Sequence, residues 1–165
     1  MFFAPDLLIQ AEEILQKLRE KKLKITTAES CTGGLLAALF TSISGASEVF
    51  ERGFITYSNQ AKIDMLGVKK ESLKNFGAVS EEVAKEMAQG ALKNSKVDIA
   101  IAITGIAGPK SDDTKKPVGL VYIALATKEK TAVQKFNFSG NRDKVRKASI
   151  KAALSLSFKQ FFQML

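Results

Sequence analysis

Hydrophobic positions follow two different spacings along the chain. Residues 6–22 place Leu7, Ile14 and Leu18 at helical spacing, which predicts an amphipathic helix. Residues 99–103 are all apolar, which indicates a strand buried on both faces. The same patterns predict strands over 23–28, 49–57, 118–127 and 131–138. They predict helices over 32–41, 59–66 and 70–76, a further helix that begins after an N-cap at Ser80, and a last helix from 141 onwards.

The order of these elements predicts the fold class. Strands alternate with helices at first, and two strands joined by the short turn 128–130 follow later. Alternation favours parallel strands joined by crossover helices, whereas a short turn joins antiparallel strands. We therefore expect an α/β fold with three layers, α/β/α. Its mixed, mostly parallel sheet would have about five strands, one of them antiparallel. The 165 residues are expected to form a single domain.

Composition restricts the chemistry. The chain has no histidine, which excludes a Ser-His-Asp triad, a Cys-His pair and any histidine-ligated metal site. Its one cysteine, Cys31, excludes an internal disulfide and a cysteine-rich metal site. A catalytic base would have to be Lys, Asp, Glu or Tyr.

The chain is basic, with a formal charge of +8 and a pI near 9.6. Such a surface attracts anions, although a solvated basic surface that aids solubility explains the charge equally well. The basic residues gather within 17–24 and 142–151, and no aromatic residues are interleaved for base stacking. This pattern favours a small anion over single-stranded nucleic acid.

Neither the N-terminus nor the longest uncharged run predicts membrane insertion. Residues 1–6 lack a basic region followed by an apolar stretch, so they do not resemble a signal peptide. Residues 30–47 are uncharged, but glycine, serine and threonine interrupt them, which indicates a buried loop and helix. We expect a cytoplasmic protein.

Candidate functional residues follow three predicted strands. Ligands of open α/β sheets bind beyond the carboxyl ends of the strands. If the strands are parallel neighbours, these segments would lie on one rim. The segments are Glu29-Ser30-Cys31-Thr32-Gly33-Gly34, Tyr57-Ser58-Asn59-Gln60-Ala61-Lys62 and Thr104-Gly105-Ile106-Ala107-Gly108-Pro109.

Ser30 stands at a sharp strand-to-helix turn. It could simply cap the following helix, the commoner role of such a serine. Alternatively it is a nucleophile, and the amides of residues 32–34 form an oxyanion hole. Cys31 is a weaker candidate, since a thiolate needs a neighbouring cation and a lone cysteine beside an apolar helix is usually a packing residue.

Lys62 lies in the first turn of the helix predicted after the cap Ser58, where the helix dipole disfavours a cation. It could be an ordinary surface lysine. However, that position and partial burial would both lower its pKa, and a neutral lysine can take the proton of Ser30. Tyr57 could pass or steady that proton, or lie at the surface. Without histidine, serine with lysine is the simplest way to activate a hydroxyl.

Further residues suggest anion binding, more weakly. The glycines of residues 104–109 resemble a phosphate cradle but match no Walker A pattern. Arg142 and Arg146 share one helix face, where they could clamp a phosphate or provide surface charge.

The first of these segments, with the residues before it, resembles the signature of the CinA C-terminal domain family, the nicotinamide-nucleotide amidohydrolases. The matching residues are Thr27-Ala28-Glu29-Ser30-Cys31-Thr32-Gly33-Gly34. Further stretches are similar to that family in the same order. They are Thr56-Tyr57-Ser58-Asn59 with Ala61-Lys62 and Leu66-Gly67-Val68; Gly77-Ala78-Val79-Ser80 with Met87-Ala88; residues 104–109; Lys116-Pro117-Val118-Gly119; and Gly140-Asn141-Arg142 with Arg146.

The resemblance implies hydrolysis of the carboxamide of nicotinamide mononucleotide to nicotinic acid mononucleotide and ammonia, in pyridine nucleotide recycling. It implies that Ser30 is the nucleophile and that Tyr57 and Lys62 are its partners. It also implies that neither a metal nor an organic cofactor takes part. We expect the oxyanion and substrate to meet a second set of residues. These are Cys31, Thr32, Gly33, Gly34, Asn59, Thr104, Gly105, Gly108 and Arg142.

The expected partner is a small nucleotide, with no membrane or nucleic acid, and we expect a homo-oligomer, a dimer or higher. The chain resembles the stand-alone form of the family. It departs from the family pattern at residues 110–113, which replace a run of glycines, and at Asn141, where an Asp is usual. Two alternatives are a basic nucleic-acid-binding accessory protein of the competence or DNA-damage type, and an oligomeric binding protein with little activity.

Overall fold

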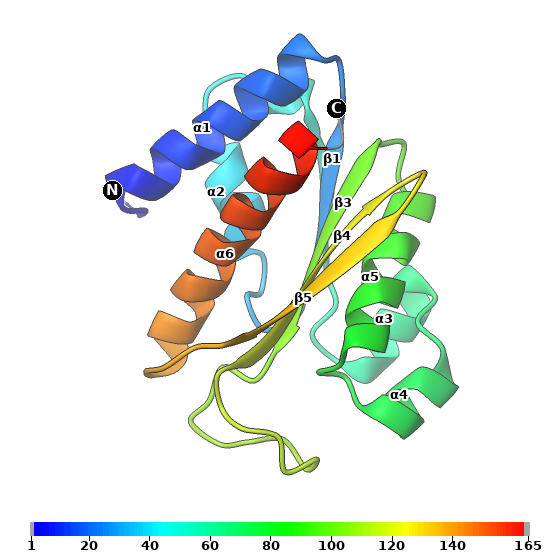
Figure 1. The fold of residues 1–165 in the computed structure, drawn as a ribbon. Coiled ribbons are helices and arrows are strands. Elements are labelled where there is room, and N and C mark those ends of the chain that lie inside the picture. The colour runs from blue at the N-terminus through cyan, green and yellow to red at the C-terminus, as the bar shows by residue number, and fades with distance from the viewer. Residues whose placement is uncertain (1, 164–165) are drawn as a thin grey trace.

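The computed structural model describes the backbone of residues 2–163 and the side chains of residues 2–160. A five-stranded sheet with the order β2-β1-β3-β4-β5 forms its centre (Figure 1). β1 pairs in parallel with β2 and β3, and β4 pairs antiparallel with β3 and β5. β4 alone therefore runs against the others, as predicted. The strands are β1 (Ile25–Glu29), β2 (Phe50–Ile55), β3 (Ile99–Gly105), β4 (Leu120–Thr127) and β5 (Thr131–Asn137).

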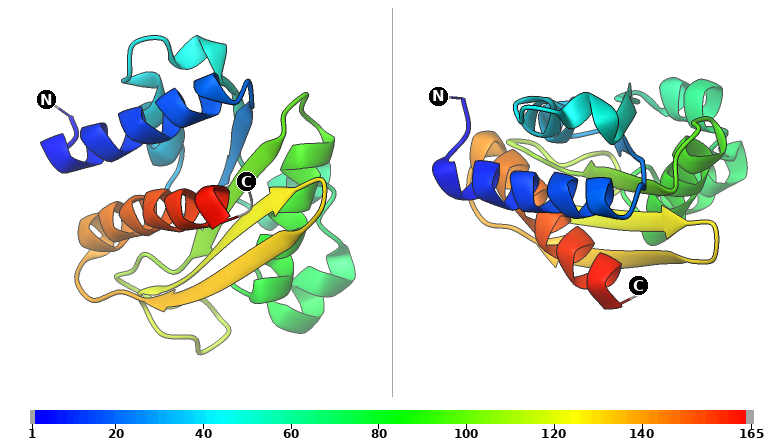
Figure 2. Two further views of the ribbon diagram at one scale, coloured as in Figure 1. Left: turned by 45° about the horizontal axis from the view of Figure 1, so that its top comes forward. Right: turned by 90° about the horizontal axis from the view of Figure 1, so that it is seen from above.

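Helices cover both faces of the sheet, which confirms the three-layer architecture (Figure 2). One face carries α1 (Pro5–Glu20), α2 (Leu35–Thr41) and α6 (Arg142–Gln163); the other carries α3 (Asn59–Leu66), α4 (Lys70–Phe76) and α5 (Glu81–Lys93). Residues 30–47 fold as a turn, α2 and the short 3-10 helix η1 (Ala46–Glu48). Among residues 2–163, no helix has the length and apolar character needed to cross a membrane.

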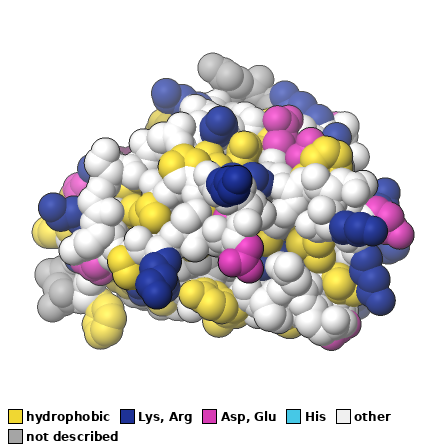
Figure 3. All heavy atoms as spheres, turned by 90° about the horizontal axis from the view of Figure 1, so that it is seen from below, with side chains coloured by type: hydrophobic (Ala, Val, Ile, Leu, Met, Phe, Trp, Pro, Cys, Tyr) yellow, Lys and Arg dark blue, Asp and Glu magenta, His cyan; other side chains and the backbone are white. Residues whose placement is uncertain are grey.

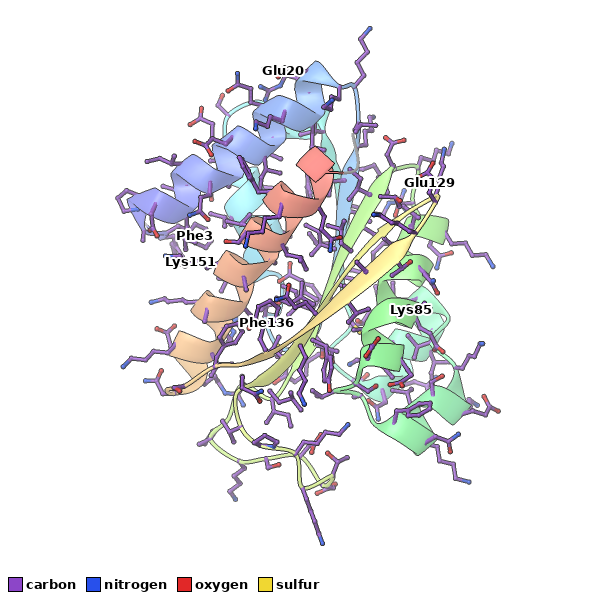
Figure 4. All side chains as sticks on the ribbon, in the orientation of Figure 1. Phe3, Glu20, Lys85, Glu129, Phe136 and Lys151 are labelled. Carbon is purple, nitrogen blue, oxygen red and sulfur yellow. The ribbon has the colours of Figure 1, made fainter. Side chains whose placement is uncertain are left out.

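The two faces of the sheet differ in side-chain size because large and small residues alternate along β3. Ile101 and Ile103 join the core beneath α1, α2 and α6, whereas Ala100 and Ala102 lie beneath α5. Successive strand residues point to opposite faces, so this alternation lets α5 approach the sheet closely. Phe136 of β5 packs against the core beneath α1, α2 and α6 (Figure 4). On the same side of the sheet, Lys151 of α6 forms an ion pair with Asp6 of α1.

The starts of α3 and α5 follow local sequence signals, whereas the start of α2 does not. The hydroxyl oxygens of Ser58 and Ser80 accept from the amides of Ala61 and Val83, so both predicted N-caps are confirmed. The helix predicted over 32–41 begins only at Leu35. The preceding residues form a turn in which Gly33 and Gly34 have φ of 59° and 96°. Glycine adopts these left-handed angles without steric cost, and this turn presents Ser30.

Gly90 gives a test of the packing between α3 and α5. A Cβ atom at this position would lie 1.9 Å from the carbonyl oxygen of Leu66, which is backbone and cannot rotate away. We expect Gly90→Ala to lower the free energy of unfolding by about 3 kcal/mol and the Tm by roughly 10 °C. Thermal unfolding measures this change. Lys85→Ala, on the exposed face of α5, is the control, and an equal effect there would contradict the packing explanation (Figure 4).

Candidate active site

The three predicted segments meet at one edge of the sheet. β1 lies between β2 and β3, and Glu29 is in register with Ile55 and Ile103. Ser30, Tyr57 and the loop after Gly105 therefore lie beyond the same edge, as predicted. Figure 3 views the molecule from this side, where Lys and Arg side chains are scattered among hydrophobic ones.

Lys62 reaches from α3 to the nucleophile candidate. Its Nζ lies 3.0 Å from the Ser30 hydroxyl oxygen, 2.9 Å from the Thr56 carbonyl oxygen and 3.3 Å from that of Tyr57. A neutral amine has two N–H groups and one lone pair. If the N–H groups donate to the two carbonyls, the lone pair is left to accept the Ser30 hydroxyl proton. The geometry thus suits a general base.

Burial lowers the pKa of the Lys62 amine, which a general base requires. Its side chain is 1% exposed, and desolvation lowers its pKa from 10.5 to about 8. Among the described side chains, no ion pair to Lys62 is present to offset this desolvation. At pH 7 about a tenth of the Lys62 side chains would therefore be neutral.

The turn after Ser30 leaves several amides unbonded. The Ser30 amide donates to the Ile103 carbonyl, and the Gly33 amide donates to the Ser30 carbonyl. The predicted oxyanion hole of residues 32–34 therefore needs a correction, because the Gly33 N–H is already used. Within residues 2–160, the amides of Cys31, Thr32 and Gly34 donate to no other protein group. These three can donate to an oxyanion.

Cys31 is unsuited to be the nucleophile. Burial raises the pKa of its thiol to about 12, so the thiol stays protonated at physiological pH. Its sulfur also packs against Gly105, where a Cβ atom would lie 3.2 Å away. The packing interpretation of this cysteine fits the structure.

Tyr57 is placed differently from Lys62. Its carbonyl holds the lysine, but its side chain is 61% exposed and its hydroxyl oxygen accepts from Arg142 at 3.3 Å. Among the described side chains, the phenol makes no hydrogen bond to Ser30 or Lys62. The structure therefore brings the side chains of Tyr57 and Arg142 together on the outer rim, where they do not contact the side chains of Ser30 and Lys62.

The remaining predicted residues surround this centre. Asn59 is exposed at the first position of α3. The Thr104 hydroxyl is fully buried and donates to the Ala78 carbonyl. Gly108, with φ of 91°, precedes an exposed loop over residues 109–115, and Lys116 ties that loop to the carbonyls of Phe76 and Val79.

Two charged side chains contact the Ser30 turn in ways that sequence patterns did not predict. The carboxylate of Glu29 accepts from the amides of Leu36 and Ala37. Arg146, expected either to clamp a phosphate or to lie on the surface, donates from Nη2 to the Thr32 carbonyl at 3.0 Å. For the Glu29 contact, the only signal in the sequence was a carboxylate at the end of an otherwise uncharged strand.

Comparison with known proteins shows the family of this chain. Residues 9–161 match the family model described as the CinA C-terminal domain. The chain belongs to this family. A competence-damage inducible protein of Caldicellulosiruptor saccharolyticus is 58% identical over 145 residues, 88% of this chain and 35% of that protein. A CinA-like protein of Endomicrobium trichonymphae is 55% identical over 84% of this chain and 32% of its own length. The chain thus spans about a third of the length of these relatives.

Solved structures share the fold of this CinA C-terminal domain. The crystal structure of competence/damage inducible protein CihA from Agrobacterium tumefaciens has a TM-score of 0.93 at 42% identity, over 96% of this chain and 98% of that one. A CinA superfamily protein from Escherichia coli has a TM-score of 0.90 at 34% identity, over 100% and 95% of the two chains. The whole domain, including the rim that carries Ser30, therefore has counterparts of known structure.

Proposed function

We propose that this CinA C-terminal domain hydrolyses the carboxamide of nicotinamide mononucleotide, giving nicotinic acid mononucleotide and ammonia. The observation that carries the proposal is the buried contact between the Lys62 amine and the Ser30 hydroxyl. The family resemblance of the surrounding motifs supports the substrate, and the geometry supports hydrolysis of an amide through an acyl-enzyme.

The reaction proceeds in two stages. Neutral Lys62 takes the Ser30 proton as the oxygen attacks the amide carbon, and the carbonyl oxygen becomes an oxyanion. The amides of Cys31, Thr32 and Gly34 stabilise this charge; a single such donor can contribute about 3 kcal/mol. Lys62 then protonates the departing nitrogen, which leaves as ammonia. Water, deprotonated by Lys62, next attacks the ester, and Ser30 is released with its proton restored.

The outer rim binds the rest of the nucleotide in this proposal. The exposed guanidinium of Arg142 is held near Tyr57 and provides a cation for the phosphate, together with the loop that follows Thr104. The net charge of +8 draws an anionic substrate towards the domain. Tyr57 contributes its carbonyl to Lys62, and its phenol would have to turn inward from Arg142 to aid the proton transfer.

Ammonia release from nicotinamide mononucleotide, without added metal and as a function of pH, tests this function. Because the neutral form of Lys62 is the base, activity must rise with pH as the amine loses its proton. We expect kcat/KM to increase about tenfold per pH unit below about pH 7 and to level off above the pKa of about 8. Ammonia release that does not change between pH 6 and 9 would contradict Lys62 as the base. No release at any pH would contradict the proposed substrate.

A further inference from the structure

The turn of residues 30–34 is held by charged side chains on both sides. Glu29 comes from the end of β1, and Arg146 comes from the second turn of α6, 114 residues from the carbonyl that it binds. We infer that Glu29 and Arg146 are positioning residues, which hold this turn so that the amides of Cys31, Thr32 and Gly34 face the oxyanion. The inference deepens the proposed function and rests on Ser30 as its nucleophile.

Glu29 fixes the end of the turn that leads into α2. Its two carboxylate oxygens lie 3.0 Å from the Leu36 amide and 2.9 Å from the Ala37 amide, and its side chain is fully buried. These amides belong to the first turn of α2, where backbone N–H groups have no partner within the helix. A carboxylate is favoured there by the helix dipole. Glu29 therefore ties α2 to the strand end that carries Ser30.

Arg146 fixes the middle of the turn. Its Nη2 donates to the Thr32 carbonyl, which also accepts from the Leu35 amide at 3.0 Å. The N–H group of the same peptide unit, on Gly33, donates to the Ser30 carbonyl. Both polar groups of the peptide between Thr32 and Gly33 are therefore bonded, and this peptide cannot rotate without losing them.

Fixing that one peptide determines where its neighbours point. Glycine crosses between backbone conformations easily, so a turn with Gly33 and Gly34 has other conformations available. Holding the peptide between Thr32 and Gly33 keeps the Thr32 and Gly34 N–H groups free on either side of it. Preorganised donors are effective because they need no rearrangement as charge develops.

The surroundings of Arg146 distinguish it from Arg142. The Arg146 side chain is partly buried, and its Nε is shielded from solvent without a protein acceptor. Arg142 is exposed on the rim. Arg146 thus faces the protein turn, whereas Arg142 is open to a ligand.

The test compares two variants with two matched controls. Arg146→Lys keeps the charge but loses the planar guanidinium that reaches Thr32, and Glu29→Gln keeps the shape but loses the charge and one acceptor. The control Arg19→Lys removes an arginine that also donates to a backbone carbonyl, that of Gly45. The control Glu86→Gln changes a carboxylate that also caps a helix start, through the Lys69 amide and the Ser72 hydroxyl.

Two readouts separate positioning from substrate binding. The first is kcat and KM for nicotinamide mononucleotide. The second is the rate at which diisopropyl fluorophosphate, a neutral reagent, modifies Ser30, followed by intact mass. We expect Arg146→Lys and Glu29→Gln to lower kcat and the modification rate about 10- to 100-fold and to leave KM within about threefold. In both controls, kcat, KM and the modification rate should stay within about threefold of the wild-type values, even if the Tm falls.

Each other result overturns the inference. A raised KM for Arg146→Lys with unchanged kcat and modification rate would make Arg146 a substrate-phosphate ligand. Equal losses in the controls would indicate a general effect of stability, and unchanged rates would show that the turn needs neither side chain. If the wild type releases no ammonia, the proposed substrate fails, but the modification rates still test the positioning. If wild-type Ser30 is not modified, the nucleophile and this inference both fail.

Discussion

Ser30→Ala is expected to eliminate ammonia release from nicotinamide mononucleotide, with a fall in kcat of about 10⁴-fold or more. The substitution removes the oxygen that, in the proposed reaction, attacks the amide and forms the acyl-enzyme, and neighbouring residues offer no replacement. Cys31 is the adjacent nucleophile, but its thiol is buried and its pKa is raised to about 12. A coupled assay for free ammonia, run on equal amounts of the two proteins, measures the change.

The matched control for this variant is Ser149→Ala. Ser149 is also buried, and its hydroxyl donates to the Val145 carbonyl within α6, away from the rim. We expect this control to retain nearly full activity and the Ser30→Ala protein to remain folded. Ammonia release by Ser30→Ala at the wild-type rate would leave the reaction in place but would show that another group is the nucleophile.

Lys62→Met should reduce kcat by at least about 10³-fold. Methionine fills a similar apolar volume but cannot accept the Ser30 proton or return it to the leaving nitrogen. Its effect on stability combines two opposing changes. The buried amine no longer has to be desolvated, but the carbonyls of Thr56 and Tyr57 lose their donor. We therefore expect a folded protein with little activity, checked by thermal unfolding and the ammonia assay.

Lys62→Arg distinguishes a base from a simple cation. Arginine stays protonated at any pH that the protein tolerates, so it supplies positive charge but cannot act as a base. We expect this variant to be as inactive as Lys62→Met, and its residual rate should not rise through pH 8. Substantial activity in Lys62→Arg would instead show that a positive charge beside Ser30 is sufficient.

The fold could be predicted well from the sequence because its signals are local. The helical spacing of residues 6–22, the apolar run of 99–103 and the serine caps each act within a few residues. Element bounds were correct for α3 and α4 and differed by a few residues elsewhere. The clearest miss was the start of α2, because the two glycines favour a left-handed turn over a helix, and apolar spacing alone does not show this.

The proposed catalytic pair could also be predicted from the sequence, since Ser30 and Lys62 each follow a strand. Parallel strands end at the same edge, so residues 32 positions apart were expected to meet, and their atoms lie 3.0 Å apart. The position of the Tyr57 phenol was not predictable in this way. Side chains at the edge of a sheet can turn inward or outward, and this one turns outward to Arg142.

The sequence alone thus determined the layers and the rim, because periodicity, caps and strand ends are read from neighbouring residues. It also offered Ser30 and Lys62 as candidates for nucleophile and base, and the family resemblance assigned them those roles. Only the tertiary structure decided which carbonyls hold the Lys62 amine, which amides remain free after Ser30, and which charges hold that turn. Glu29 and Arg146 act on backbone groups rather than on side chains. Backbone carbonyls occur at every position and N–H groups at nearly every position, so apart from the carboxylate at the end of β1 no residue pattern marks these contacts. They exist only once α2 and α6 have packed beside β1.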